Sequence, residues 1–189
     1  NLAEHALENL MTCVAQGYDK LLAESTRTWN NWWLRGRVVI DTHHYRDQQA
    51  LDFALYHLFA MTPTHSERCS IAAKGLTGEG YKGHVFWDTE VFLLPFHLLT
   101  QPNIARQLIS YRWHNLAGAR RKAQIKGYCG ALFPWESART GDEETPKFAA
   151  INIRTGLRQK VASALAEHHL VADIAWAVDI YFQTTGDDV

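Results

Sequence analysis

Two short segments of the chain place a tryptophan directly before a carboxylate. In GEGYKGHVFWDTE the pair is Trp87 and Asp88, and in FPWES it is Trp135 and Glu136. An indole offers an apolar face to a sugar ring, and a carboxylate accepts charge-assisted hydrogen bonds from hydroxyl groups. The glycines of the first segment allow the backbone to bend tightly and to approach a ligand closely. The two segments therefore predict a shared pocket, with His84 of the first segment as a further candidate for its lining.

Each segment also has a purely structural interpretation. Aspartate is common at helix starts, so Asp88 could cap a helix while Trp87 fills the core. Trp135 could be one buried side chain in an acidic surface loop, since GDEETP follows it closely. The residue types alone leave both interpretations open.

A third candidate is the run Glu167-His168-His169, which we expect on the last helix. Steps of three and four residues from Glu167 lead along an otherwise apolar stripe to Phe182. A carboxylate at the edge of a buried face is costly unless it is paired, which favours a polar pocket near Glu167 and His168. The alternative is that the first turn of this helix emerges into water.

Other chemistries have no support in the spacing of residues. The histidine pairs at 43–44 and 168–169 are adjacent, whereas two metal ligands on one helix face need a spacing of four, and no HExxH occurs. GxSxG and GxxxxGK[ST] are absent from the sequence as well. Residues 78–83, GEGYKG, match GxGxxG, but they lie inside a long expected loop and not between a strand and a helix, as dinucleotide binding requires. We expect no metal site, no nucleotide site and no serine-hydrolase triad.

Composition narrows the class further. The 189 residues are 47% hydrophobic and 12% aromatic, with a formal net charge of -1. A packed core is therefore expected, and nucleic acid or an anionic membrane is not expected as a partner. No apolar run is long enough for a transmembrane helix. Three widely spaced cysteines favour a reducing compartment, which we take to be the cytoplasm.

Hydrophobic periodicity predicts an all-α chain with two long loops. Helices are expected over residues 2–34, 47–61, 87–99, 102–127 and 157–183, with Pro95 kinking the third and Pro102 starting the fourth. Residues 37–42 are expected to form a short strand or an extended linker. The loops are residues 62–85 and 128–146, and loops of such length inside a compact domain are usually functional or mobile. Helices ending in such loops fit a toroid with a site at one mouth.

At these motifs the sequence resembles glycoside hydrolase family 65, whose members include disaccharide phosphorylases acting on α-glucosides. The matching text is GEGYKGHVFWDTEVFLLPF, YRWHNLAGARRKA, GALFPWESA with GDEETP, AEHHLVADIAWAV and TTGDD. The resemblance implies part of an (α/α)6 barrel, with residues 1–36 as a linker helix region and 37–189 as the amino-terminal part of the barrel. It also implies that Trp87 and Asp88 hold the glucosyl unit where the bond breaks. Trp135 and Glu136 are expected at the same mouth, with Glu167 and His168 on an inner barrel helix.

The resemblance further implies an inverting phosphorolysis, in which kojibiose and phosphate give β-D-glucose 1-phosphate and glucose. Maltose, trehalose or nigerose phosphorolysis, or hydrolysis, are the alternatives within the family. The family's general acid is a glutamate in a GPDE-type segment, which this sequence lacks, so we expect that acid beyond Val189 and no catalytic residue within the chain. Phosphate is expected as co-substrate, without a cofactor, and a homodimer is an option for the full-length protein.

Two interpretations from other classes remain. The chain could be a non-catalytic carbohydrate-binding helical module, or a structural piece without a function of its own. For such a structural piece, helix faces left uncovered in half a toroid would favour association of the isolated chain.

Overall fold

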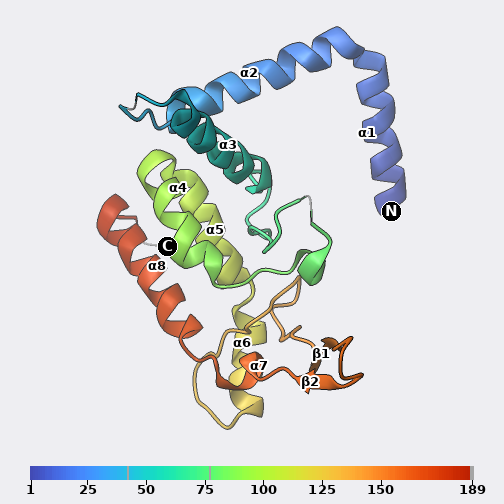
Figure 1. Ribbon diagram of the computed structural model, residues 1–189, viewed down its shortest axis with the longest axis vertical. Helices are drawn as coiled ribbons and strands as arrows, with labels where there is room; N and C mark the ends of the chain where they lie inside the picture. The colour runs from blue at the N-terminus through green and yellow to red at the C-terminus, as the bar shows by residue number, and fades with distance from the viewer. Residues whose placement is uncertain (42, 77, 188–189) are drawn as a thin grey trace. The chain divides into compact units, whose positions relative to one another are not determined.

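The computed structural model describes residues 1–41, 43–76 and 78–187. The chain divides into two compact units, Asn1–Leu55 and Tyr56–Val189 (Figure 1). Thr42, where the expected strand or linker ends, and Asp188, the last acidic residue of TTGDD, lie outside the described residues.

The first unit is helical, but the single helix expected over residues 2–34 is wrong. α1 (Leu2–Gln16) and α2 (Tyr18–Gly36) meet at Gly17, whose φ of +78° glycine tolerates without strain. The described residues of the linker that follows, 37–41 and 43–44, have no regular structure. They precede α3 (Tyr45–Met61), whose last turns belong to the second unit. The Arg37 guanidinium in this linker binds Asp52 of α3 at 2.7 Å. The linker alternative, rather than the strand, is therefore what the described residues show.

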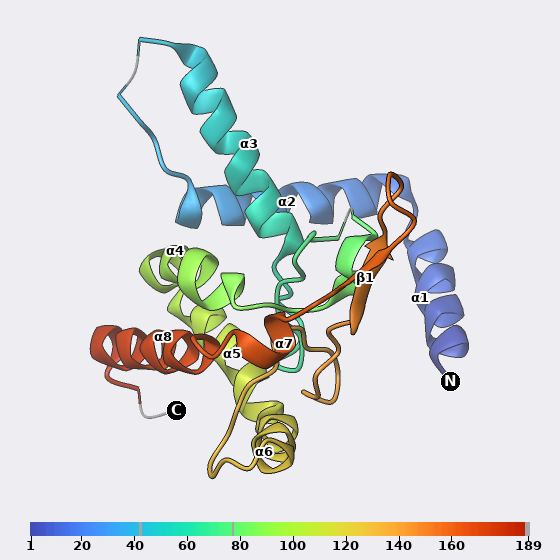
Figure 2. The ribbon, with the colours of Figure 1, turned by 60° about the horizontal axis from the view of Figure 1, so that its bottom comes forward.

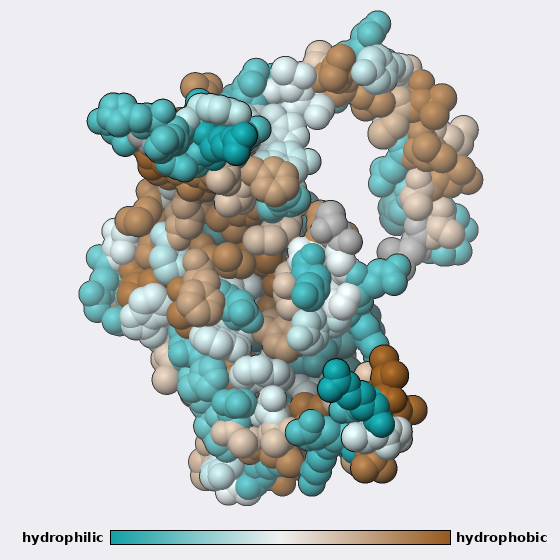
Figure 3. Space-filling model, in the orientation of Figure 1, coloured by the Kyte–Doolittle hydropathy of each residue, from teal (hydrophilic) through white to brown (hydrophobic). Residues whose placement is uncertain are grey.

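Apolar side chains gather along α1 and remain exposed (Figure 3). They are Leu7, Leu10, Met11 and Val14, each more than half exposed. Patches of this kind usually mark a surface that another segment or protein covers. The expected association of the isolated chain stays a prediction.

The core of the second unit lies where three helices pack together. α4 (Leu94–Thr100), α5 (Pro102–His114) and α8 (Leu170–Thr185) lie side by side (Figures 1 and 2). Their fully buried apolar residues include Leu94, Ala105, Leu108, Leu170 and Ala177. Pro102 starts α5 as predicted, and the helix expected over 87–99 is a π-helical turn, η2 (Thr89–Leu93), followed by α4. Pro95 fits the first turn of α4, where its missing N–H costs little.

Two further expected helices, both in the second unit, are divided in the structure. The helix predicted over 102–127 breaks at Asn115, with φ and ψ of −97° and 5°, and resumes as α6 (Leu116–Ile125). The helix predicted over 157–183 is wrong in its first half. Antiparallel strands β1 (Phe148–Ile151) and β2 (Arg158–Lys160) form a hairpin, and the short helix α7 (Ser163–Ala166) separates it from α8. Asn152 and Gly156 explain the hairpin, because the Asn152 side chain accepts bonds from two backbone N–H groups and Gly156 has a φ of +68°.

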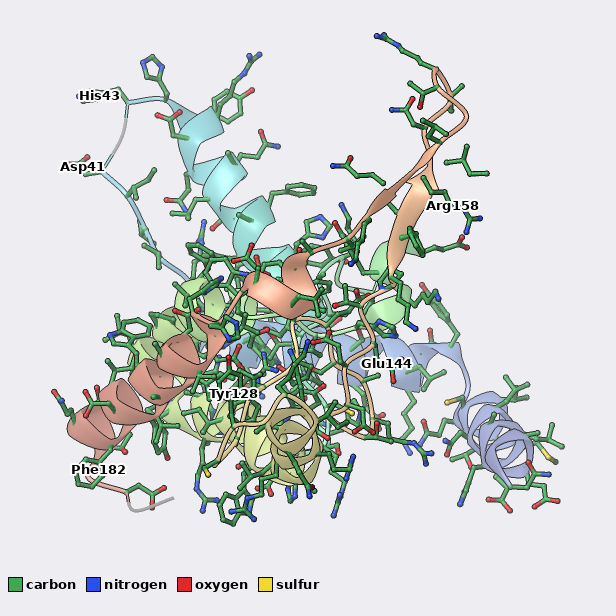
Figure 4. All side chains as sticks on the ribbon, turned by 90° about the horizontal axis from the view of Figure 1, so that it is seen from below. Asp41, His43, Tyr128, Glu144, Arg158 and Phe182 are labelled. Atoms are coloured by element: carbon green, nitrogen blue, oxygen red, sulfur yellow. The ribbon has the colours of Figure 1, made fainter. Side chains whose placement is uncertain are left out.

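The hairpin projects from the helices of the second unit, with Arg158 lying on it, as Figures 2 and 4 show. Phe182, near the end of α8, is 47% exposed and points away from that unit (Figure 4). The second unit is thus mainly helical, with one small sheet among its described residues. In the described part of the chain, no helix is both long and apolar enough to cross a membrane.

Candidate functional site

A cleft of about 1130 Å³ in the second unit is lined by both tryptophan–carboxylate pairs. Its walls come from the 3₁₀ turn η1 (Gly80–Gly83), the start of η2, the 128–146 loop and β1. Trp87, Asp88, Trp135 and Glu136 all line it. Small-ligand pockets commonly measure about 300–1,000 Å³, so this cleft has room for a disaccharide.

A short β-bridge joins the two segments that carry these pairs. The Val85 N–H donates to the Ser137 carbonyl at 2.9 Å, and the Ser137 N–H donates to the Val85 carbonyl at 3.0 Å. Val85 lies two residues before Trp87, and Ser137 directly follows Glu136. The bridge therefore explains how residues some fifty positions apart reach one cleft.

Trp87 and Asp88 stand where the 62–85 loop turns into η2. Trp87 is half-buried and Asp88 is exposed on the cleft. Asp88 occupies the cap position of η2, yet its side chain makes no capping hydrogen bond within the described residues. The capping interpretation of Asp88 is therefore not what the structure describes, and Asp88 lines the cleft instead.

Glu136 is held from the other side of the bridge. Its Oε1 lies 2.8 Å from Nδ1 of His84, and the side chains are 7% and 15% exposed. An ionised carboxylate only accepts hydrogen bonds, so Nδ1 is the donor. The His84–Glu136 pair joins the two predicted segments a second time, beside the backbone bridge, and fixes the direction of the Glu136 carboxylate.

Behind the cleft, a buried ion pair fastens the backbone of both segments. The Arg112 guanidinium of α5 binds both carboxylate oxygens of Glu90, at 2.7 and 2.9 Å. It also donates to the Phe86 carbonyl at 2.7 Å and to Ser137 Oγ at 3.4 Å. Burial alone would lower the pKa of Arg112, but the Glu90 carboxylate more than offsets this and raises it. Arg112 therefore stays charged and holds the residue before Trp87 in place.

A second carboxylate, Glu143, shapes the loop that carries Trp135. Its Oε2 accepts from Lys122 Nζ at 2.5 Å and from the Trp135 N–H at 3.0 Å, and its Oε1 accepts from the Glu136 N–H at 3.2 Å. Burial would raise the pKa of Glu143, but hydrogen bonds from Lys122 and Thr145 lower it overall. Glu143 thus anchors the loop as an anion, which the surface-loop interpretation did not anticipate.

The same loop approaches α6 at a place where only glycines fit. A Cβ on Gly118 would stand 2.2 Å from the carbonyl carbon and oxygen of Gly141, well inside van der Waals contact. Gly141 itself has a φ of +70°. The two glycines allow the backbone of the loop to lie directly against α6, which sets the distance between this helix and the loop that carries Trp135.

These segments match a known family. Residues 52–189 match the model described as the glycosyl hydrolase family 65 central catalytic domain. The chain belongs to glycosyl hydrolase family 65. Its mainly helical second unit is part of an (α/α)6 barrel, in agreement with the predicted fold class.

Relatives of this family 65 chain include a kojibiose phosphorylase from Escherichia coli (strain K12), 69% identical over 97% of the chain. A kojibiose phosphorylase from Halothermothrix orenii is 48% identical over 99% of the chain, and a kojibiose hydrolase from Flavobacterium johnsoniae is 41% identical over 91%. These matches cover 24%, 24% and 23% of the relatives, so the chain spans about a quarter of their length. A solved structure described as a kojibiose phosphorylase from the human microbiome matches this chain with a TM-score of 0.81 and 26% sequence identity. The match covers 98% of this chain and 23% of the chain in that structure.

Three predicted site residues do not line the cleft. His84 contacts Glu136 but is not itself part of the lining, and Glu167 and His168 lie elsewhere. Glu167 and His168 are not on the last helix, because α7 ends at Ala166 and α8 begins at Leu170. Both side chains are exposed and neither lines the cleft, while the ring of His168 lies 6.3 Å from that of Tyr128. The alternative in which this turn emerges into water describes them better.

Sequence reasoning missed other residues of the cleft. Tyr81 and Lys82 line the cleft, and their backbone φ values of 60° and 54° are strained for residues other than glycine. Glu144 also lines the cleft and lies on the 128–146 loop (Figure 4). The flanking glycines were the only signal for the turn at Tyr81, and nothing in the residue types separated Glu144 from its acidic neighbours.

The described residues hold no group of three or more His, Cys, Asp or Glu side chains placed to bind a metal ion. The expectation that the protein needs no metal or cofactor stays a prediction.

Proposed function

We propose that this chain supplies the sugar-binding part of an inverting disaccharide phosphorylase that acts on kojibiose. The observation that carries the proposal is the single cleft into which the Val85–Ser137 bridge brings both tryptophan–carboxylate pairs. The kojibiose phosphorylases among the relatives support the choice of disaccharide.

In this proposal the two indoles contact the apolar faces of sugar rings, and the carboxylates accept bonds from hydroxyls. Asp88 holds the glucosyl unit, and Glu136, oriented by His84, contacts the same sugar or its neighbour. Contacts that strengthen as the ring flattens toward an oxocarbenium ion lower the barrier, whereas uniform binding does not. Asp88 and Glu136 are therefore assigned to substrate binding and not to proton transfer.

The chemistry needs one acid and one nucleophile. An inverting glycosidase needs an acid for the leaving oxygen and a base that activates water on the opposite face. Inorganic phosphate is already an anion and attacks the anomeric carbon directly, so a phosphorylase dispenses with the base. The C1–O bond to the leaving glucose breaks, its oxygen takes the proton of the acid, and β-D-glucose 1-phosphate forms with inversion. We expect the acid in residues outside this chain.

The test is a product assay with the full-length protein. Kojibiose with inorganic phosphate should give equal amounts of β-D-glucose 1-phosphate and glucose, and omission of phosphate should stop the reaction. Release of two glucose molecules without phosphate would overturn the proposal in favour of a kojibiose hydrolase, the activity named for the Flavobacterium johnsoniae relative. Binding of kojibiose without turnover would instead favour a carbohydrate-binding module.

Several expectations stay predictions beside this proposal. They are phosphate as the co-substrate, the cytoplasmic location, a homodimer of the full-length protein, and a domain boundary after residue 36. The family model begins at residue 52 and the compact units divide between Leu55 and Tyr56. The linker region therefore includes at least α1 and α2 in our proposal.

A further inference from the structure

One side chain outside the cleft lining contacts both tryptophans. The His169 ring lies 4.8 Å from the Trp87 ring and 6.0 Å from the Trp135 ring, centroid to centroid. The interplanar angles are 87° and 79°, so both contacts are edge-to-face. Aromatic rings favour this arrangement over a face-to-face sandwich. A single imidazole thus links the two predicted sugar-binding segments to the start of α8.

The orientation of this imidazole is set by α8 itself. Nδ1 of His169 lies 2.6 Å from Oδ2 of Asp173, one turn further along the helix. The carboxylate accepts, so Nδ1 is the donor. Leu170 and Ile174 of the same helix are buried in the core, so the anchor belongs to a rigid element. Glu167 adds a weaker contact, 3.6 Å from Nε2.

We propose that His169 is a positioning residue of the sugar cleft, whose ring, through its edge-to-face contacts, fixes the orientation of the Trp87 and Trp135 indoles relative to each other. The inference rests on the proposed function, because it takes these indoles to contact the sugar. His169 does not line the cleft and therefore acts through the indoles. Loss of the ring should weaken sugar binding and leave the chemical step largely intact.

The experiment compares three variants of the full-length protein. His169→Asn removes the ring but keeps a donor for Asp173, and His169→Phe keeps a ring edge but loses that donor. Asp179→Asn is the matched control, because Asp179 lies on the same helix and binds only a near neighbour, Gln183, in the contacts described. The readouts are KM and kcat for kojibiose with saturating phosphate, and the near-ultraviolet circular dichroism of the indoles.

We expect His169→Asn to raise KM about tenfold with kcat changed less than about threefold, the size expected when ring–ring contacts are lost. Its indole dichroism should change, and His169→Phe should restore most of both signals. The control should match the parent protein. An unchanged KM in a folded His169→Asn protein, or a His169→Phe protein as impaired as His169→Asn, would overturn the proposal.

The dichroism separates this proposal from the proposed function. It reports the orientation of the indoles whether or not the protein turns over a disaccharide. If phosphorolysis and hydrolysis are both absent but the dichroism follows the expected order of variants, the positioning role stands and the proposed function fails. If activity is present and the dichroism of His169→Asn equals that of the parent, the positioning role is refuted alone.

Discussion

Replacement of Asp88 by asparagine is the most direct test of the cleft. The side chain is exposed, lines the cleft and makes no capping hydrogen bond among the described residues, so Asp88→Asn should leave the fold intact. It keeps the size of the side chain and one acceptor oxygen but removes the charge. Any large effect on activity should therefore come from contacts with the substrate.

The size of the effect follows from the hydrogen bonds that Asp88 can offer. Hydrogen bonds to charged groups contribute about 1.5–3 kcal/mol, and those between neutral groups about 0.5–1.5 kcal/mol. Each hydrogen bond from a sugar hydroxyl to residue 88 should therefore be weakened by about 1–1.5 kcal/mol. A carboxylate with two oxygens can serve two neighbouring hydroxyls, which gives a total of about 2–3 kcal/mol and a fall in kcat/KM of roughly 30- to 160-fold. Because these bonds tighten as the ring distorts, we expect most of the loss in kcat.

The assay measures initial rates of glucose 1-phosphate formation by the full-length protein over a range of kojibiose concentrations. Asp179→Asn on the exposed side of α8 is the control for loss of one carboxylate charge. A folded Asp88→Asn protein whose kcat/KM stays within about twofold of the parent would refute the assignment, because a charged contact to the sugar contributes more than that.

Two further predictions concern supports of the cleft, and a third concerns His97, a buried histidine of α4. Arg112→Met leaves Glu90 buried without its partner and should cost about 3–5 kcal/mol, seen as a large fall in thermal midpoint that a second change, Glu90→Leu, recovers in part; equal midpoints for the single and double variants would contradict this. Gly118→Ala should displace Gly141, raise KM and cost about 1–3 kcal/mol, and an unchanged KM would show that the loop is not fixed there. Burial lowers the pKa of His97 from 6.5 to about 4, so the unfolded state takes up a proton first as pH falls. Stability should therefore be full above pH 6.5 and fall by about 3 kcal/mol between there and pH 4, whereas His97→Gln should remove this part of the denaturation profile.

The short-range part of the site could be predicted from sequence because its chemistry is local. A tryptophan beside a carboxylate identifies a candidate wherever the chain folds, and both pairs line the cleft. The contacts that unite them could not be predicted, since the Val85–Ser137 bridge and the Arg112–Glu90 ion pair join residues far apart in the sequence. Nothing in a local pattern specifies such partners.

The errors at the end of the chain have a geometric cause. The apolar pattern beyond Gly156 suits a helix, but the Asn152 turn closes a hairpin first, and α8 begins only at Leu170. Successive residues near a helix start point about 100° apart, because a turn takes 3.6 residues. The residue pattern favoured His168, whereas its neighbour His169 is the residue that contacts the tryptophans. A misplaced helix start therefore changes which of the two neighbours is expected to face the tryptophans.

The reciprocal backbone pairing of Val85 and Ser137 has a consequence for altering sugar preference. The bridge makes the position of each loop depend on the other. If only one loop were replaced by that of a relative with another disaccharide, half of the binding surface would be new and the retained loop would be displaced. Successful exchanges should transfer both loops together, and natural insertions in one loop should be accompanied by adjustments in the other.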